Sequence, residues 1–294
     1  QREYNKLMHE AGFKQIGADN CMFIKVDPIH GRIICGNYVD DLICLTASTH
    51  LRDWWRGLLR KRFTKVTFED KLDYILGIKV DTGTDSNGMR YIELNNSTSI
   101  ERIAKQAGVD DKCRKINTPM DPSVRLRKKR EGEDTDSSYT PAFDYRSVLG
   151  GIMYISNISR PDLVTAVNKL CRYASDPSHA HYRALFKVIT FAYQTRDRYL
   201  RYTQSEDTEG ADPFRLYAAS DSSYADCIDT GRSTIGRALW MGSKTRGLID
   251  WKSTVPSNVA MSTTQAELQA ASEASKDIIY RRALLYELGY EQDG

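Results

Sequence analysis

Several patterns are absent from this sequence of 294 residues, and each absence narrows the class of protein. None of the six cysteines forms a Cys-x-x-Cys pair or shows zinc-finger spacing, which excludes the common zinc modules and indicates free thiols in a reducing compartment. Histidine is scarce, and His179 and His181 have no third ligand close in sequence, so we interpret them as structural. No apolar run approaches the roughly 18 residues that a membrane span requires, and no secretory signal opens the chain.

Net charge is also low, at +3, so global charge does not require a nucleic-acid partner. Local charge is more suggestive, because basic residues gather in two runs that could follow phosphates. Either run could instead be a solvated helix face or a loop. The first run has Trp54 and Trp55 between its basic residues, which are Arg52, Arg56, Arg60, Lys61, Arg62 and Lys65. The second lies within residues 112–130 and includes Arg125, Arg127, Lys128, Lys129 and Arg130.

Length and hydrophobic periodicity predict about two domains with real cores. Strands are expected at residues 33–39, 42–46, 72–81, 91–94, 215–219, 236–241 and 247–252. Helices are expected at residues 1–7, 51–63, 99–107, 145–155, 161–173, 181–195 and 264–288. The first helix has no cap and no initiator Met, which suggests a fragment. Residues 121–141 are the best linker candidate, and residues 205–213 form a second polar break.

The last three strands and the long helix after them suggest an α/β unit with the helix packed on a sheet. The apolar face of that helix is predicted to consist of Leu268, Ala271, Ile278, Leu285 and Leu288.

Two adjacent carboxylates, Asp40 and Asp41, follow Tyr38 and Val39 at the tip of the first pair of predicted strands. Because neighbouring carboxylates repel each other, we expect a cation there, and Mg²⁺ is bound by one or two carboxylates plus substrate phosphates. The alternative is that Asp is simply a good turn residue.

A second acidic pair is separated in sequence. Asp221 follows the strand at residues 215–219, and Glu267 lies in the first turn of the last helix. A strand end and a helix start can direct two carboxylates at a common point. The alternatives are that Asp221 is a turn residue and that Thr264 and Glu267 form a capping box.

The ordered series of motifs resembles the polymerases of copia-type retrotransposons over nearly the whole chain. Tyr38-Val39-Asp40-Asp41 resembles the metal-binding palm motif of reverse transcriptases, and the expected companions follow in order at residues 76–80, 118–120, 145–150 and 160–162. Residues 220–226, 232–236, 251–253 and 262–268 resemble the successive markers of the retrotransposon ribonuclease H fold.

The resemblance implies an α+β or α/β fold in three parts. Residues 1–120 would be a palm and thumb portion, residues 121–204 a linker and helical connection, and residues 205–294 a ribonuclease H-like domain truncated at its end. Asp40, Asp41, Asp221 and Glu267 would hold Mg²⁺ or Mn²⁺ as catalytic ligands. Predicted contacts to primer-template or RNA–DNA hybrid are Tyr38, Arg56, Arg60, Lys61, Arg62, Arg232, Ser233 and Thr234.

The implied parent activity is RNA-directed DNA synthesis from dNTPs, with cleavage of RNA in hybrids, inside the cell (cytoplasm, nucleus or both) and away from membranes. Each site lacks an acid that the family carries, on an earlier palm strand and on a strand after the last helix, and Ser223 replaces a second acid of the first-strand motif. The rival interpretation is therefore an inactive nucleic-acid-binding remnant. A third interpretation is an unrelated α/β binding protein in which every motif is structural.

Overall fold

A computed structural model describes residues 2–121, 123–134, 142–203, 214–242 and 247–292. The fold mixes helices with antiparallel sheets, as the α+β interpretation expected. Parts of the predicted linker at 121–141 and the whole break at 205–213 lie outside the described residues. Contacts divide the chain into two compact units, residues 1–71 with 277–294, and residues 72–276.

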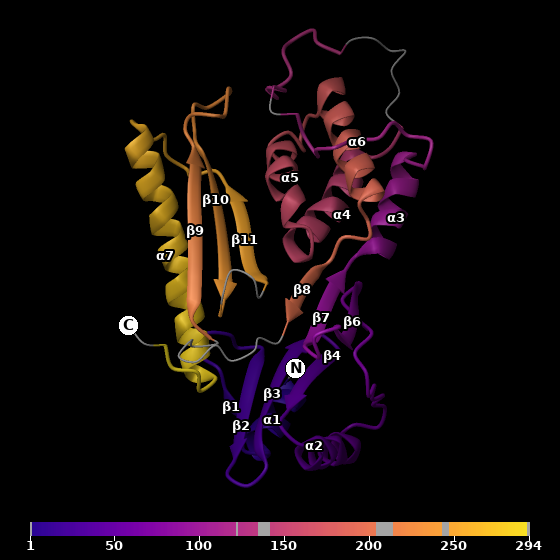
Figure 1. Cartoon of the computed structure of the whole chain (residues 1–294), viewed down its shortest axis with the longest axis vertical. Coiled ribbons are helices and arrows are strands. Elements are labelled where there is room, and N and C mark those ends of the chain that lie inside the picture. Colours follow the sequence, from indigo (N-terminus) through magenta and orange to yellow (C-terminus); the bar gives the residue numbers. More distant parts are fainter. Residues whose placement is uncertain (1, 122, 135–141, 204–213, 243–246, 293–294) are drawn as a thin grey trace. The chain divides into compact units, whose positions relative to one another are not determined.

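The first unit contains an antiparallel sheet in the order β1-β2-β3-β4, drawn in indigo in Figure 1. Its strands are β1 (Lys14–Gln15), β2 (Met22–Asp27), β3 (Gly31–Tyr38) and β4 (Asp41–Thr46), and its helices are α1 (Arg2–Glu10) and α2 (Thr49–Arg62). The alternate residues Ile33 and Cys35 of β3 are fully buried against Leu51 and Trp55 of α2. This packing fixes the register of the hairpin, because a slip of one residue would turn the apolar set to solvent.

The helix α2 forms as its sequence predicts. Ser48 caps it by accepting a hydrogen bond from the Leu51 backbone N–H, and its last turn carries Arg60, Lys61 and Arg62. Cations at that end interact favourably with the helix dipole, so the basic run also has a structural reason.

The second unit contains two sheets and a bundle of helices. Strands β5 (Tyr74–Ile75), β6 (Ile78–Thr84), β7 (Arg90–Asn95) and β8 (Leu200–Thr203) form one sheet in sequence order. The bundle consists of α3 (Ser97–Ala107), α4 (Tyr145–Ile158), the short 3-10 helix η1 (Pro161–Leu163), α5 (Val164–Cys171) and α6 (His179–Gln194). Its core is formed by side chains such as Ile103, Ile152, Leu170 and Leu185, each at most 1% exposed.

The second sheet of this unit has the order β11-β10-β9, from strands β9 (Leu216–Ser223), β10 (Thr234–Met241) and β11 (Leu248–Thr254). Helix α7 (Thr263–Glu287) begins in this unit, and its last residues, from Asp277, belong to the first. Trp251 of β11 donates a hydrogen bond from its indole N–H to the carbonyl of Ser156 in α4, at 2.7 Å. The sheet face that carries Trp251 is therefore the face toward the bundle.

Three expectations about elements were wrong in detail. The strand at 72–81 is two strands, because Leu76 and Gly77 both have positive φ (52° and 76°) and form a tight hairpin turn between Ile75 and Ile78. Strands β1, β2 and β8 were not predicted. The predicted face of the last helix was wrong in its first half, where Leu268 (65%) and Ala271 are exposed and the buried stripe is Ala266, Ala270 and Ala274. Towards its end the prediction holds better, because Leu288 is buried.

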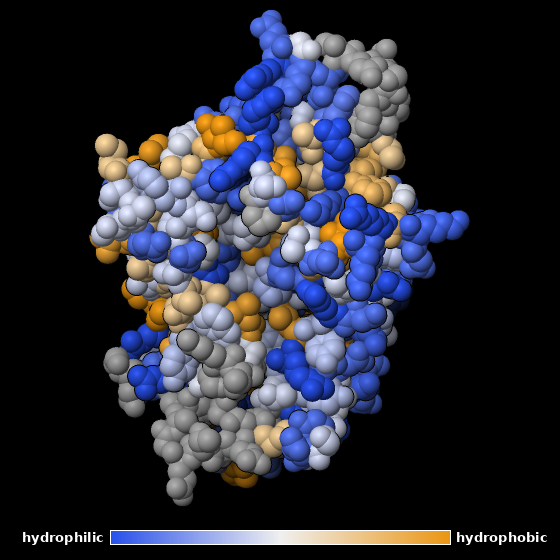
Figure 2. Space-filling model, turned by 45° about the horizontal axis from the view of Figure 1, so that its top comes forward, coloured by the Kyte–Doolittle hydropathy of each residue, from blue (hydrophilic) through white to orange (hydrophobic). Residues whose placement is uncertain are grey.

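Hydrophilic side chains cover most of the surface shown in Figure 2, with hydrophobic ones in small patches between them. The exposed large hydrophobic side chains are spread over many elements, which is ordinary for a folded protein. Among the described residues, no helix combines the length and the apolar character needed to cross a bilayer.

Candidate metal and nucleic-acid sites

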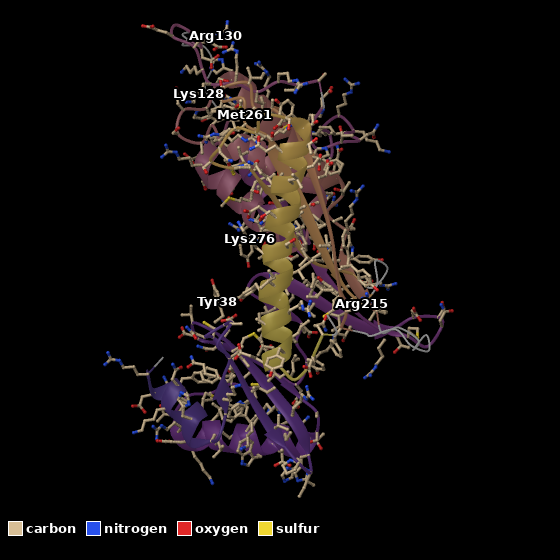
Figure 3. All side chains as sticks on the ribbon, turned by 90° about the vertical axis from the view of Figure 1, so that its left-hand side faces the viewer. Tyr38, Lys128, Arg130, Arg215, Met261 and Lys276 are labelled. Carbon is tan, nitrogen blue, oxygen red and sulfur yellow. The ribbon has the colours of Figure 1, made fainter. Side chains whose placement is uncertain are left out.

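The acidic hairpin is built as the sequence predicts. Tyr38 pairs with Asp41 across the β3–β4 ladder, so Val39 and Asp40 form a two-residue turn. Tyr38 is 60% exposed at this tip (Figure 3), and both carboxylates are exposed. Within the described part of the chain, neither carboxylate is engaged by a hydrogen bond or ion pair, so both are available to an external cation.

Val39 carries backbone strain at the turn. Its φ is 54°, a left-handed conformation that β-branched residues rarely adopt. Such strain costs of order 1–3 kcal/mol and persists where the surroundings enforce it, often at ligand sites. Here the paired strands and their packing on α2 enforce it, so the fold determines the backbone of the turn that carries the two carboxylates.

Carboxylate oxygens of this kind fit a hard divalent cation, which completes its coordination with water and substrate oxygens. Among the described residues, no group of three or more His, Cys, Asp or Glu side chains is arranged to hold a metal. The hairpin thus places Asp40 and Asp41 next to each other at an exposed tip, and their role as metal ligands stays a prediction.

Asp221 is not at a turn. It lies inside β9, opposite Gly236 of β10, and is exposed. A Cβ added at Gly236 would meet no atom within 4 Å, so the sheet surface beside the Asp221 carboxylate is open. The alternative of a turn residue is therefore wrong, and the position leaves room for a ligand.

Glu267 does not form the capping box that was the alternative interpretation for it. Helix α7 is capped two residues earlier than predicted, at Ser262, whose hydroxyl accepts from the Gln265 backbone N–H at 3.2 Å. The Gln265 side chain in turn accepts from the Met261 N–H at 2.7 Å. Glu267 is exposed in the first turn. The capping-box alternative for Thr264 and Glu267 is therefore wrong.

Asp221 and Glu267 lie on different elements, and the strand register decides which face of the sheet Asp221 occupies. Arg237 lies on the face of β10 opposite to that of Gly236 and Asp221, since strand side chains alternate. The Arg237 guanidinium is 3.8 Å from the Glu273 carboxylate of α7, so α7 covers the Arg237 face. Asp221 points to the other face.

The predicted phosphate-binding side chains of α2 are partly engaged inside the first unit. Arg56 forms an ion pair with Asp70 at 2.7 Å, and this bond holds the pKa of the Asp70 carboxyl below its usual range. Arg62 is paired with Glu3 at 2.8 Å. Arg60 lies over the Phe68 ring at 4.9 Å, and Lys61 is exposed. Lys61 is the member of this group most available to phosphate.

Two other predicted contacts, Ser233 and Thr234, are buried at 2% and 6% exposure. The Ser233 hydroxyl accepts from the Ala225 N–H, and the Thr234 hydroxyl donates to Asp226 at 2.6 Å while accepting from Arg172 at 2.7 Å. Burial favours a structural role for both. Arg232, beside them, stays partly exposed.

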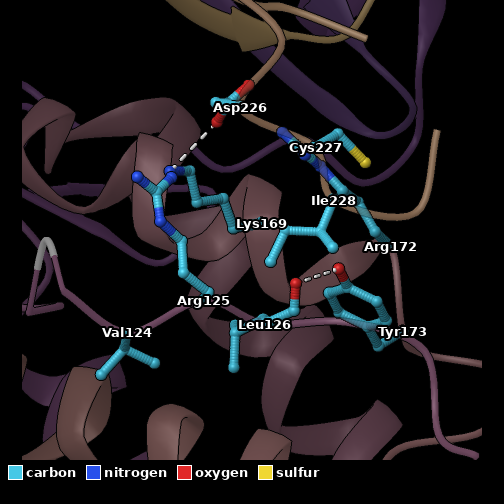
Figure 4. A pocket seen from close by; sticks show the side chains of 9 residues that line it. All are labelled: Val124, Arg125, Leu126, Lys169, Arg172, Tyr173, Asp226, Cys227 and Ile228. Carbon is cyan, nitrogen blue, oxygen red and sulfur yellow. Dashed lines mark hydrogen bonds and ion pairs between the residues drawn. The ribbon is translucent and has the colours of Figure 1, made fainter. Parts of the chain in front are cut away.

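Sequence reasoning missed a basic pocket in the second unit (Figure 4). Arg125, Lys169 and Arg172 line it together with a single acid, Asp226, which pairs with Lys169 at 3.1 Å. Lys169 and Arg172 lie three residues apart on one face of the chain at α5, and that spacing was the available signal. Arg125 belongs to the second basic run, so one residue of this run lines the same pocket as Lys169 and Arg172.

Sequence comparison relates the chain to transposon proteins. It is 28% identical over 293 residues to the Retrovirus-related Pol polyprotein from transposon TNT 1-94 of Nicotiana tabacum, covering 99% of this chain and 21% of the relative. It is 25% identical over 276 residues to the Transposon Ty1-LR3 Gag-Pol polyprotein of Saccharomyces cerevisiae, covering 91% and 15%. The chain thus spans about a fifth or less of these polyproteins.

A shorter relative is Secreted RxLR effector protein 161 of Plasmopara viticola, 33% identical over 136 residues, which are 46% of this chain and 89% of that protein. No family model matches the chain, and no solved structure matches it.

Proposed function

Because the chain belongs to the retrovirus-related Pol polyproteins of copia-type transposons, we propose that it carries part of an RNA-directed DNA polymerase followed by part of a ribonuclease H domain. The observation that supports the polymerase half most directly is the hairpin tip, where two exposed carboxylates stand on a strained turn over a packed sheet.

In the polymerase half, Asp40 and Asp41 hold Mg²⁺ or Mn²⁺. When bound, the ion would neutralise charge on the triphosphate oxygens of the incoming nucleotide. The turn at Val39 holds the backbone that carries both carboxylates, and the exposed Tyr38 ring is proposed to pack against the primer end. Lys61 and its neighbours on α2 contact phosphates, which positions the duplex without reading sequence.

In the nuclease half, Asp221 and Glu267 are proposed as ligands of the metal ions that cleave RNA in a hybrid. Such hydrolysis requires several carboxylates around the scissile phosphate. The surface beside Asp221 is open, and Glu267 takes no part in capping α7. Both observations are compatible with that role. Arg232 is the proposed hybrid contact on this side.

A second candidate is a nucleic-acid-binding protein without chemistry. The observation that favours it is the β9–β10 register, which directs Asp221 away from the face that α7 covers. On this proposal, the basic side chains of both units bind hybrid through its backbone, and the acids have no catalytic task.

One gel separates the two candidates. The chain is incubated with a primed RNA template, labelled on both strands, together with dNTPs and Mg²⁺. On the first proposal, Asp40→Asn lowers primer extension by about 100-fold or more and leaves RNA cleavage, while Glu267→Gln does the reverse. Asp53→Asn is the matched control, since Asp53 is an exposed carboxylate of the same unit, paired with Arg52.

Absence of both reactions, with hybrid binding that weakens steeply with salt, would support the second candidate. Loss of both activities in either single variant, with the fold intact, would contradict the assignment of two separate sites.

A further inference from the structure

We propose that Cys35 and Cys44 form a redox-active dithiol that closes to a cross-strand disulfide behind the acidic hairpin. The two residues are directly opposite each other in the β3–β4 ladder. Their sulfur atoms lie 2.8 Å apart. An S–S bond of about 2.05 Å, with Cα atoms about 4.4–6.8 Å apart, is within reach of directly opposed residues in an antiparallel ladder, so the backbone need not move far.

The surroundings hold the two sulfurs together. Cys35 is fully buried in the core between β3 and α2, and Cys44 is partly buried at its edge. The Tyr4 hydroxyl is buried close to both sulfurs and has no hydrogen-bond partner among the described residues. The core therefore holds the two sulfur atoms in contact with each other.

The hydrogen bond with Cys44, together with burial, raises the pKa of the Cys35 thiol far above its ordinary value. Oxidation therefore begins at the more accessible Cys44. With hydrogen peroxide as the oxidant, the Cys44 sulfur attacks one peroxide oxygen, which gives a sulfenic acid and one water. The Cys35 sulfur then displaces the hydroxyl of that sulfenic acid as a second water, and the S–S bond forms. Two thiols are oxidised by two electrons and one peroxide is reduced.

The bond would close a ring from Cys35 to Cys44 that contains Tyr38, Asp40 and Asp41. Three further rungs of the ladder lie between the bond and the turn, at Gly36, Asn37 and Tyr38. Closing the ring restricts local opening of the hairpin, so oxidation would stiffen the tip that carries the two carboxylates. This consequence concerns the hairpin alone and holds whichever proposed function is correct.

The sequence makes the test direct. Trypsin cuts after Arg32 and Arg52, and the peptide between them contains Cys35 and Cys44, no other cysteine and no internal Lys or Arg. The native chain is treated with limiting hydrogen peroxide, quenched in denaturant with iodoacetamide, and digested. Cys21 is exposed and lies in a separate tryptic peptide, so it reports the general oxidation of a surface thiol.

We expect the peptide to lose two hydrogens and take up no label, while the Cys21 peptide stays labelled. Closure should outrun every other cysteine pairing by roughly tenfold or more, because the partners are already in contact. In Cys35→Ser the peptide should instead gain oxygen at Cys44. Hydrogen exchange of the amides from Gly36 to Ile43 should slow by about tenfold on oxidation.

Uptake of two labels by the oxidised native chain would overturn the proposal, as would a bond from either cysteine to Cys21. The same closure rate in urea-unfolded chain would also overturn it, since the fold would then contribute nothing. The primary measurement uses the unsubstituted chain, so it does not depend on a variant that folds.

Discussion

Two acidic motifs of this chain, Asp40-Asp41 and Arg160-Pro161-Asp162, differ in how their carboxylates are used. Asp40 and Asp41 are exposed at a hairpin tip of the first unit. Asp162, in the second unit, receives two hydrogen bonds of 2.8 Å from the Arg160 guanidinium and one of 2.9 Å from Arg198. Arg160 itself is 2% exposed and also donates to Thr195.

This contrast gives a criterion for telling acids that are available to a ligand from acids that the fold itself uses. A carboxylate with all its hydrogen bonds satisfied inside the fold has little capacity left for a ligand, and its loss leaves a buried cation unpaired. An exposed carboxylate held on a strained turn contributes little to stability and keeps its oxygens free. Both motifs belong to the same ordered series, so their presence in the sequence did not distinguish these tasks.

Of the changes to the two acidic motifs, breaking the buried one should lower stability most. Asp162→Asn should lower the free energy of unfolding by about 2–4 kcal/mol, discounted from a fully buried pair because the Asp162 side chain is 31% exposed. Asp40→Asn should change it by less than about 0.5 kcal/mol, as expected for a surface site. Urea unfolding of both variants measures the contrast, and equal losses would abolish the distinction between the two motifs.

Acid should lower the stability of the fold partly by protonating Asp162. Burial raises the pKa of Asp162, but the bonds from Arg160 and Arg198 outweigh it and hold the pKa below the ordinary value. A depressed folded pKa stabilises the fold above the unfolded pKa of about 3.9, and this stabilisation is lost as pH falls through the folded pKa. The unfolding free energy should therefore decline below about pH 4, and less steeply in Asp162→Asn, which urea titrations at several pH values would measure.

A smaller effect is expected at the strained turn. Val39→Gly should raise the free energy of unfolding by about 1 kcal/mol or less, because glycine adopts the observed φ of 54° without a steric cost but gains freedom in the unfolded chain. Val26→Gly on β2 is the control, since Val26 is 66% exposed and outside the positive-φ positions, and it should destabilise. A loss of stability in Val39→Gly would show that the turn is not strained.

The sequence predicted best what neighbouring residues determine. The hairpin at Asp40, helix α2 and the end of α3 at Gly108, whose φ is 73°, all follow from local signals. It predicted poorly what depends on distant partners. Strand β8 forms because Leu200 pairs with Leu94, more than a hundred residues earlier in the chain. The residues around Leu200 give no signal of that partner.

The candidate sites divide in the same way. Asp40 and Asp41 are adjacent in the chain, so a turn suffices to bring them together. Asp221 and Glu267 depend on which face of a sheet a helix covers, and the alternation of β9 places Asp221 on the other face. The spacing of Lys169 and Arg172 indicates a shared face, but only the fold shows that Arg125 and Asp226 line the same pocket. The role of each acid as a ligand stays a prediction.

A substitution at Leu268 should have almost no effect on stability. It tests why the buried face at the start of α7 was mispredicted. Hydrophobic size favoured Leu268, but the helix buries Ala266, Ala270 and Ala274, each 5% exposed or less. Small residues let the helix approach a sheet closely, so a large side chain on that stripe would be overpacked. Leu268→Ala should therefore change the free energy of unfolding by less than about 0.5 kcal/mol. Leu239→Ala on β10, 1% exposed on the face that α7 covers, should cost about 2–5 kcal/mol. A comparable loss in Leu268→Ala would contradict the alanine stripe as the face of α7 that is buried.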